Sequence, residues 1–136
     1  MLDGLGADAL VDSENGAVLR VSLPWIRSLP IAAARDVEVQ IDGAPVSAPQ
    51  VRLGDRRVAL QDLVLESGWW FVQDRLALEL DRRLDAGSHL VRLRFGLAIP
   101  YLQVGPDGPL TLPFHFEREL TAVAPGSPAG VALDVA

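Results

Sequence analysis

The sequence predicts a single all-β domain, a two-sheet antiparallel β-sandwich of jelly-roll-like design. Several short segments place an apolar residue at every second position, which is the period of a strand with one buried face. Turn-forming residues separate these segments at spacings of about 8 to 12 residues, as in sandwiches and barrels. The window nearest to a helical period, residues 27–36, is short and lies beside prolines. Alternation with one polar face favours antiparallel sheets over parallel ones.

The longest alternating segment, residues 84–101, is expected to be the central strand of the fold. Its apolar positions are Val91, Leu93, Phe95, Leu97 and Ile99. Arg92 and Arg94 stand between them, so one face of the strand is apolar and the other polar. Gly87 supplies the turn before the strand, and Pro100 ends ladder pairing because it has no N–H to donate. We therefore expect the other strands to pack around this segment.

Further strands are expected on both sides of it. They are residues 18–23, 37–41, 51–53, 57–60, 69–72, 76–80 and 110–117. Asn15-Gly16, Asp42-Gly43 and Gly54-Asp55 are pairs typical of the turns in β-hairpins. The sequence thus supplies both the strands and the connections of a sandwich.

The two ends of the chain have weaker patterns. Residues 1–15 are expected to form a short arm or an edge strand. Residues 122–136 are small and rich in Pro, Gly and Ala, so we expect a flexible tail after a sandwich domain of residues 1–121.

Composition limits the partners and the cellular location. The chain has 136 residues and a net charge of -6, which argues against binding to nucleic acid. Without cysteine it has neither disulfides nor thiolate metal sites. The first residues resemble neither a signal peptide nor a membrane anchor, so we expect a cytoplasmic protein with no membrane contact.

Two histidines are the natural candidates for chemistry. His89 shares the parity of the apolar face and is either a ligand or base, or a hydrogen-bonded residue that fixes the turn at residues 85–87; we favour the structural role. His115 and Glu117 share the polar face of one strand and could bind a metal or move protons, although surface pairs of this kind are common. Because no known catalytic motif is present, we expect no catalytic residue and no metal site in this chain.

Aromatic residues are stronger candidates for binding than for catalysis. Large aromatic side chains and arginine dominate binding hot spots, because they bury much area at a low entropic cost. The candidates for contact with a substrate or partner are Trp25, Arg27, Trp69, Trp70, Tyr101 and His115. Successive strand residues face opposite ways, so we expect one of Trp69 and Trp70 to lie in the core.

Four motifs follow one another between residues 18 and 121. They are Pro24 with Arg27, the run from Val37 to Gly43, Trp70-Phe71, and Gly87-x-His89-x-Val91 followed by Ile99-Pro100-Tyr101. In this order they resemble motifs of the β subunits of C-glycoside deglycosidases. Ile26 differs, because that family usually has an aromatic residue there.

The resemblance implies an accessory function in carbohydrate metabolism. The family's small β-sandwich proteins associate with a larger α subunit, a barrel related to sugar isomerases, in a hetero-oligomer. The complex is a carbon–carbon lyase that eliminates an aromatic aglycone from a 3-oxo C-glycoside. The catalytic base and a divalent metal, expected to be manganese, belong to the α subunit. By this resemblance the chain holds no cofactor of its own and is inactive alone.

Two other functions stay open on the residues themselves. One is a stand-alone carbohydrate-binding sandwich that uses Trp25, Trp69 or Trp70 as a stacking platform. The other is a structural adaptor domain without a ligand.

Overall fold

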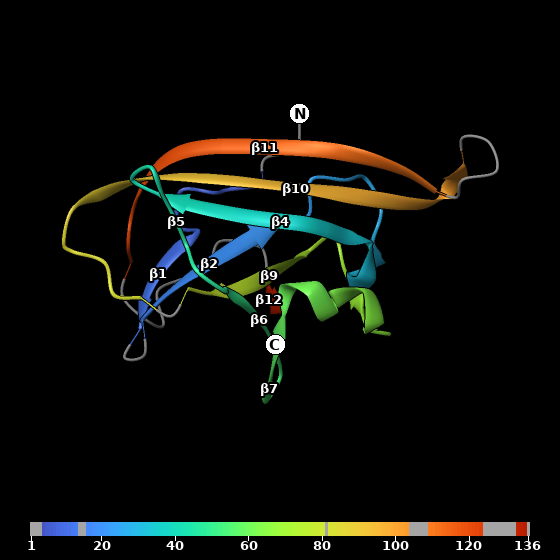
Figure 1. The fold of residues 1–136 in the computed structure, drawn as a ribbon, viewed down its shortest axis with the longest axis horizontal. Coiled ribbons are helices and arrows are strands. Elements are labelled where there is room, and N and C mark those ends of the chain that lie inside the picture. Colours follow the sequence, from blue (N-terminus) through green and yellow to red (C-terminus); the bar gives the residue numbers. More distant parts are fainter. Residues whose placement is uncertain (1–3, 14–15, 81, 104–108, 124–132, 136) are drawn as a thin grey trace.

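The protein consists of two stacked β-sheets and a short ribbon, as Figure 1 shows. The computed structural model describes residues 4–13, 16–80, 82–103, 109–123 and 133–135. The larger sheet has the order β1-β2-β9-β6-β7, with β12 beside β9, and the smaller sheet has the order β11-β10-β4-β5. All strand pairs within the two sheets are antiparallel except β12–β9. The predicted all-β sandwich is therefore confirmed.

The bounds of the elements are as follows. The larger sheet contains β1 (Leu10–Ser13), β2 (Gly16–Ser22), β6 (Gln50–Leu53), β7 (Arg56–Ala59), β9 (Asp74–Glu79) and β12 (Leu133–Val135). The smaller sheet contains β4 (Ala34–Ile41), β5 (Ala44–Pro45), β10 (Ser88–Gln103) and β11 (Pro109–Thr121). The ribbon consists of β3 (Leu29–Pro30) and β8 (Trp69–Trp70), and two 3₁₀ helices lie beside it, η1 (Ile31–Ala33) and η2 (Leu60–Leu65).

Strand β10 lies at the centre of the smaller sheet, as its alternation predicts. It pairs with β11 on one side and with β4 on the other. Regular pairing with β11 stops at Ile99, before Pro100, but the strand continues beyond the expected end, and Gln103 pairs with Pro109 after a shift in register. Its alternating apolar side chains, from Val91 to Ile99, are at most 5% exposed, whereas Arg92 and Arg94 face solvent. The buried face packs against the larger sheet and forms the main core.

The hairpin turns predicted at residues 42–43 and 54–55 are present in the structure. Asp42 and Gly43 have φ angles of 52° and 83°, and the strands that they connect pair Ile41 with Ala44. Two positive φ angles in succession are what a two-residue hairpin of type I′ needs, which explains the Asp-Gly pair. Gly54 likewise has a φ of 63° in the β6–β7 hairpin. Asn15 lies outside the described residues.

The expected strand at residues 69–72 is shorter in the structure. Only Trp69 and Trp70 pair, with Pro30 and Leu29, because a turn begins at Phe71, whose carbonyl accepts the amide of Asp74. The predicted strand at 57–60 ends at Ala59 and continues as η2. Leu60 and Leu63, three residues apart, point to the core from η2, and that spacing matches the three-residue turn of a 3₁₀ helix.

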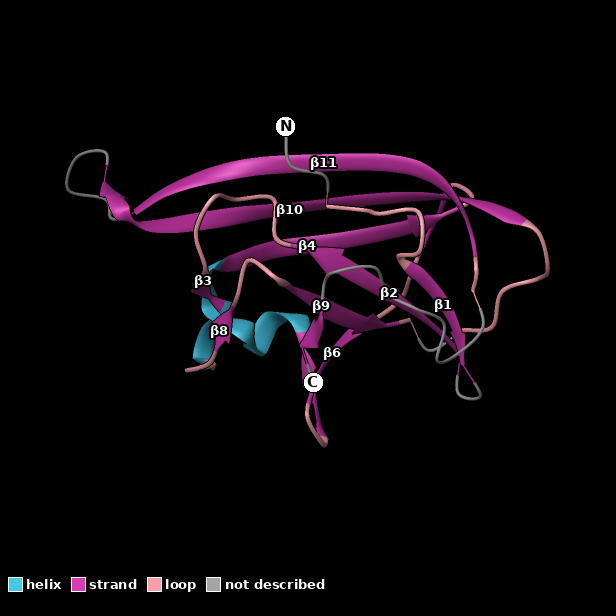
Figure 2. Cartoon of the chain, turned by 180° about the vertical axis from the view of Figure 1, so that it is seen from behind, coloured by secondary structure: helices cyan, strands magenta, loops and turns pink. Residues whose placement is uncertain are grey.

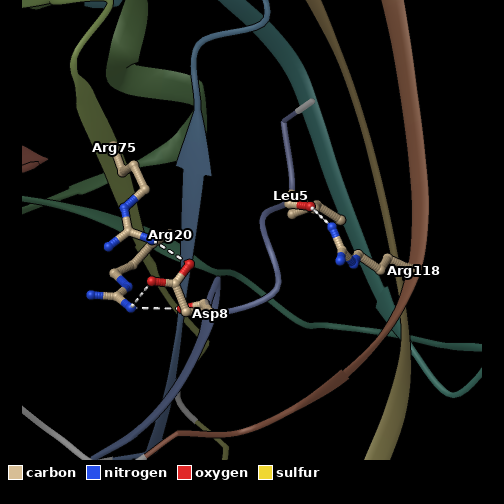
Figure 3. A network of polar contacts seen from close by, with 5 residues as sticks. All are labelled: Leu5, Asp8, Arg20, Arg75 and Arg118. Carbon is tan, nitrogen blue, oxygen red and sulfur yellow. Dashed lines mark hydrogen bonds and ion pairs between the residues drawn. The ribbon is translucent and has the colours of Figure 1, made fainter. Parts of the chain in front are cut away.

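The segment before β1 forms polar contacts with strands of both sheets, as Figure 3 shows. Arg20 of β2 donates to the carbonyl of Asp8 at 2.6 Å, and Arg75 of β9 donates to the Asp8 carboxylate at 3.1 Å. Arg118 of β11 donates to the carbonyl of Leu5 at 2.9 Å. These bonds reach β2 and β9 of the larger sheet and β11 of the smaller one, so the segment joins the two sheets, and its Leu5 is fully buried. The edge strand expected near the N-terminus is present as β1.

Most of the expected tail, residues 124–132 and 136, lies outside the described residues. Val123 bonds to Leu10 and Asp12 on the outer edge of β1, and β12 pairs with the first half of β9. The division into a sandwich of 1–121 and a flexible tail of 122–136 stays a prediction. No helix among the described residues is long and apolar enough to cross a membrane.

Candidate functional site

The β3–β8 ribbon brings two loops together at one end of the sandwich. Leu29 pairs with Trp70 and Pro30 with Trp69, although the residues are about 40 positions apart in the chain. Beyond the ribbon, the amide of Val72 donates to Ser28 Oγ at 3.0 Å. The loop at residues 24–28 is therefore held beside the loop that follows Trp70.

The 3₁₀ helix η2 adds a third segment to the same end, as Figure 2 shows. Its buried Leu63 anchors it to the core. Arg56 forms a two-bond ion pair with Glu66, with distances of 2.7 and 3.3 Å, and so ties the residue after η2 to β7. Between η2 and β8, the carbonyl of Gly68 accepts the amide of Ile31 at 3.0 Å, which holds the segment after η2 against the first residue of η1.

Exposed large apolar side chains gather on these three segments. The set consists of Ile26, Val64, Leu65, Trp69, Phe71 and Val72, which we call the apolar end. Leu65 and Ile26 are 79% and 76% exposed, and Trp69 is 51% exposed. One further exposed residue of this kind, Leu102, lies in the last part of β10. A surface of this composition is typical of a contact with another macromolecule.

The two adjacent tryptophans have different environments. Trp70 is 1% exposed, its ring centroid lies 6.1 Å from that of Phe95, and its indole N–H donates to the carbonyl of Asp74 at 3.2 Å. Core packing accounts for this residue. Trp69 points the other way and is half exposed, as strand alternation requires. Of this pair, Trp69 is the one available to a ligand or partner.

Three other predicted contact residues lie near the apolar end without belonging to it. Trp25 is partly buried and packs against the core, while Arg27 is exposed in the same loop. Tyr101 belongs to the last part of β10, the part of the strand that carries Leu102. Figures 1 and 2 show that this part of β10 and the start of β11 project at the end where η2 lies.

His115 lies elsewhere, on the outer face of the smaller sheet. It is exposed and stands opposite Arg94 in the β10–β11 register. Glu117 binds Arg92 at 2.9 Å, and Glu38 lies 3.8 Å from Arg94, so this face is covered by cross-strand ion pairs. Within the described part of the chain, no group of at least three His, Cys, Asp or Glu residues could hold a metal ion.

His89 has the structural position that its parity predicts. Its Nε2 lies 2.6 Å from the carbonyl oxygen of Asp85, in the turn before β10. Its Nδ1 lies 2.7 Å from the Asp42 carboxylate, a partner 47 residues away that sequence reasoning did not identify. The hydrogen bond that His89 donates to the Asp42 carboxylate is the main cause of a raised pKa for His89.

Sequence reasoning also missed part of the apolar end. Val64 and Leu65 lie in a segment without a regular period, so nothing in their spacing separates exposed positions from buried ones. Val72 was expected at the end of a strand that the structure ends at Trp70. The available signal was an apolar surplus, a mean hydropathy of +0.24 in a chain of this size.

Comparison with known proteins gives the family. No family model matches the chain. A 3'-dehydrocarminate deglycosidase beta subunit from a Microbacterium species is 36% identical over 101 residues, which cover 71% of this chain and 76% of the relative. A C-glycoside deglycosidase beta subunit from Arthrobacter globiformis is 31% identical over 98 residues, 68% of this chain and 74% of the relative. A C-glycoside deglycosidase beta subunit from Microbacterium trichothecenolyticum is 29% identical over 112 residues, 79% of this chain and 86% of the relative.

These similarities cover about two thirds or more of the chain, and they agree with the resemblance carried by the four sequence motifs. The chain belongs to the family of C-glycoside deglycosidase β subunits.

Proposed function

We propose that this chain is the accessory β subunit of a heteromeric C-glycoside deglycosidase, and that it binds a catalytic α subunit through the apolar end. The observation that carries the proposal is that six exposed apolar side chains lie on segments joined at one end of the sandwich, in a family whose members are named as β subunits. Burial of this cluster against a partner removes apolar surface from water, which is the main driving force of association.

The reaction that we propose for the complex is the elimination of an aromatic aglycone from a 3-oxo C-glycoside. The ketone acidifies the C–H bond between it and the anomeric carbon, so a base removes that proton. The electron pair forms a carbon–carbon double bond in the sugar ring as the bond to the aglycone breaks, and the departing aglycone carbon takes up a proton. The base belongs to the α subunit, a barrel that holds a divalent metal, which we expect to be manganese. The present chain contributes a folded surface that completes the complex.

The sheet edges support docking at the end of the sandwich. Strand β11 carries Pro113 and β5 carries Pro45, and proline interrupts the pattern of donors that an added strand needs. Strand β7 is short and carries Arg56 and Arg57. The outer edge of β1 is bonded by Val123. Addition of a partner strand is therefore disfavoured, and the apolar end is the more suitable contact.

The test is reconstitution with the barrel protein encoded nearest to this chain's gene. Lyase activity on a 3-oxo C-glucoside is expected when both chains are co-expressed, and none when either purified chain is assayed alone. Turnover by this chain alone, or full activity of the barrel protein without it, contradicts the proposal.

The alternative of a stand-alone carbohydrate-binding domain depends on the exposed ring of Trp69. It predicts that the isolated chain binds a glycoside and that Trp69→Ala abolishes this binding. Calorimetric titration of the isolated chain with a C-glucoside and with its aglycone separates the two functions. Saturable binding without any partner would favour the alternative.

A further inference from the structure

A polar site lies where β10 begins, at His89, on residues that the proposed function does not use. His89 is 8% exposed, yet both of its ring nitrogens face oxygen atoms. One oxygen is the carbonyl of Asp85 at 2.6 Å, and the other belongs to the Asp42 carboxylate at 2.7 Å. Both distances are those of short, direct hydrogen bonds.

The chemistry of the two oxygens determines the state of the ring. A backbone carbonyl accepts hydrogen bonds and never donates, and the same holds for an ionised carboxylate. A neutral imidazole has one N–H only, so one of its nitrogens would direct a lone pair at an oxygen. Only the imidazolium form donates from both nitrogens.

We infer that His89 is held as a buried imidazolium, and that this proton is a pH-dependent clamp joining the β4–β5 turn, the loop before β10 and the first residues of β10. The inference concerns this chain alone and does not depend on the proposed partner. It goes beyond the turn-fixing role because it assigns the charge and makes the junction sensitive to pH.

Asp42 is built to receive this cation. Its positive φ of 52° places it in the hairpin turn, and its second carboxylate oxygen accepts the amide of Leu90 at 2.8 Å. The amide of Asp42 in turn donates to the carbonyl of Leu90 at 2.8 Å. The hydrogen bond from His89 is the main cause of a lowered pKa for Asp42, and the Leu90 amide acts in the same direction.

The charged groups around the clamp favour the imidazolium on balance. Asp42 and Asp85 both raise the pKa of His89 above 6.5, while burial opposes them. Arg82, in the loop before β10, acts on Asp42 and lowers its pKa. The clamp is therefore intact between the lowered pKa of Asp42 and the raised pKa of His89, and it is released as the pH rises through the latter value.

Nuclear magnetic resonance of the full-length chain tests the protonation state. The chain has only two histidines, so a His115→Gln variant assigns the imidazole signals. The midpoint of titration of His89 is expected to lie above 6.5, and below that midpoint both of its nitrogens are expected to carry protons. A midpoint at or below 6.5 would overturn the inference.

Hydrogen exchange tests the clamp as a device. Above the midpoint of His89, the protection factor of the Leu90 amide is expected to fall at least tenfold, while that of Leu93 in the middle of β10 stays constant. Asp42→Asn should lower the midpoint of His89 and weaken Leu90 protection already at pH 7. If Asp42→Asn does not fold, Leu90 protection in the unmodified chain still decides the matter: equal protection on both sides of the midpoint contradicts the clamp.

Discussion

The two ends of the sandwich differ in how completely contacts within the chain account for their side chains. At the start of β10, His89, Asp42 and Leu90 bind one another through short hydrogen bonds. At the apolar end, large side chains such as Leu65 and Ile26 stay more than three-quarters exposed. The first end is explained by the fold of this chain. The second fits the contact with an α subunit that we propose, and so the comparison indicates where to look for function.

The same contrast occurs within the dipeptide Trp69-Trp70. One indole is 1% exposed and has its N–H bonded, whereas the other is 51% exposed. Two residues of identical chemistry thus provide matched probes, one of folding and the other of association.

The largest effect is expected for Trp70→Ala. Removal of a buried indole leaves a cavity beside Phe95 and should lower the free energy of unfolding by about 3 to 5 kcal/mol. Chemical denaturation of the full-length chain measures this loss. A loss below about 1 kcal/mol would show that the Trp70 pocket collapses or is not part of the core.

A smaller effect, and on a different quantity, is expected for Trp69→Ala. It should weaken association with the α subunit by about 1 to 4 kcal/mol, because aromatic residues dominate binding hot spots. The free energy of unfolding should stay nearly constant. Titration calorimetry of the two subunits and denaturation of the single chain provide the two readouts, and the reverse pattern would mean that Trp69 serves the fold.

The third prediction concerns His89 at the start of β10 and the pH dependence of stability. Because the folded pKa of His89 lies above its ordinary value of 6.5, the stabilisation is complete below 6.5 and is lost as the pH rises through the folded pKa. The folding equilibrium constant should fall by up to about tenfold per pH unit in this window. His89→Gln removes the titrating group, so its stability should lack this decline. Denaturation curves at a series of pH values measure both chains, and parallel declines would exclude His89 as the cause.

The smallest effect is expected for Arg92→Ser on the outer face of the smaller sheet. Its ion pair with Glu117 joins two half-exposed side chains, and exposed pairs contribute about 0 to 1 kcal/mol. Both the free energy of unfolding and the free energy of association with the α subunit should change by less than about 1 kcal/mol. A large loss of affinity would move the partner contact from the apolar end to this face.

The fold was accessible from the sequence because alternation and turns are local signals. The parity of Val91 to Ile99 predicts which side chains are buried, and Asp42-Gly43 predicts a hairpin that the positive φ angles confirm. The ribbon was not accessible in this way. Its strands have two residues each, which is too short for a periodic pattern. The first residue of η2 was expected in a strand, and only the structure shows that Leu63 of η2 is buried.

The candidate site was predictable only in part. Alternation indicates that one of Trp69 and Trp70 is exposed, but it does not indicate that Ile26 and Leu65 share the same end. That arrangement depends on the pairing of Leu29 with Trp70 and on the Gly68–Ile31 hydrogen bond, which join segments far apart in the chain. The partner of His89 was missed for the same reason.

Hydroxyl-radical footprinting of the chain, free and in complex with the α subunit, tests the central claim most directly. We expect Trp69, Phe71 and Leu65 to lose reactivity in the complex, while His115 and Pro113 on the outer sheet face keep theirs. Protection of His115 and Pro113 with unchanged reactivity of Trp69 and Phe71 would contradict the account, because the partner would then cover the sheet and leave the apolar end exposed.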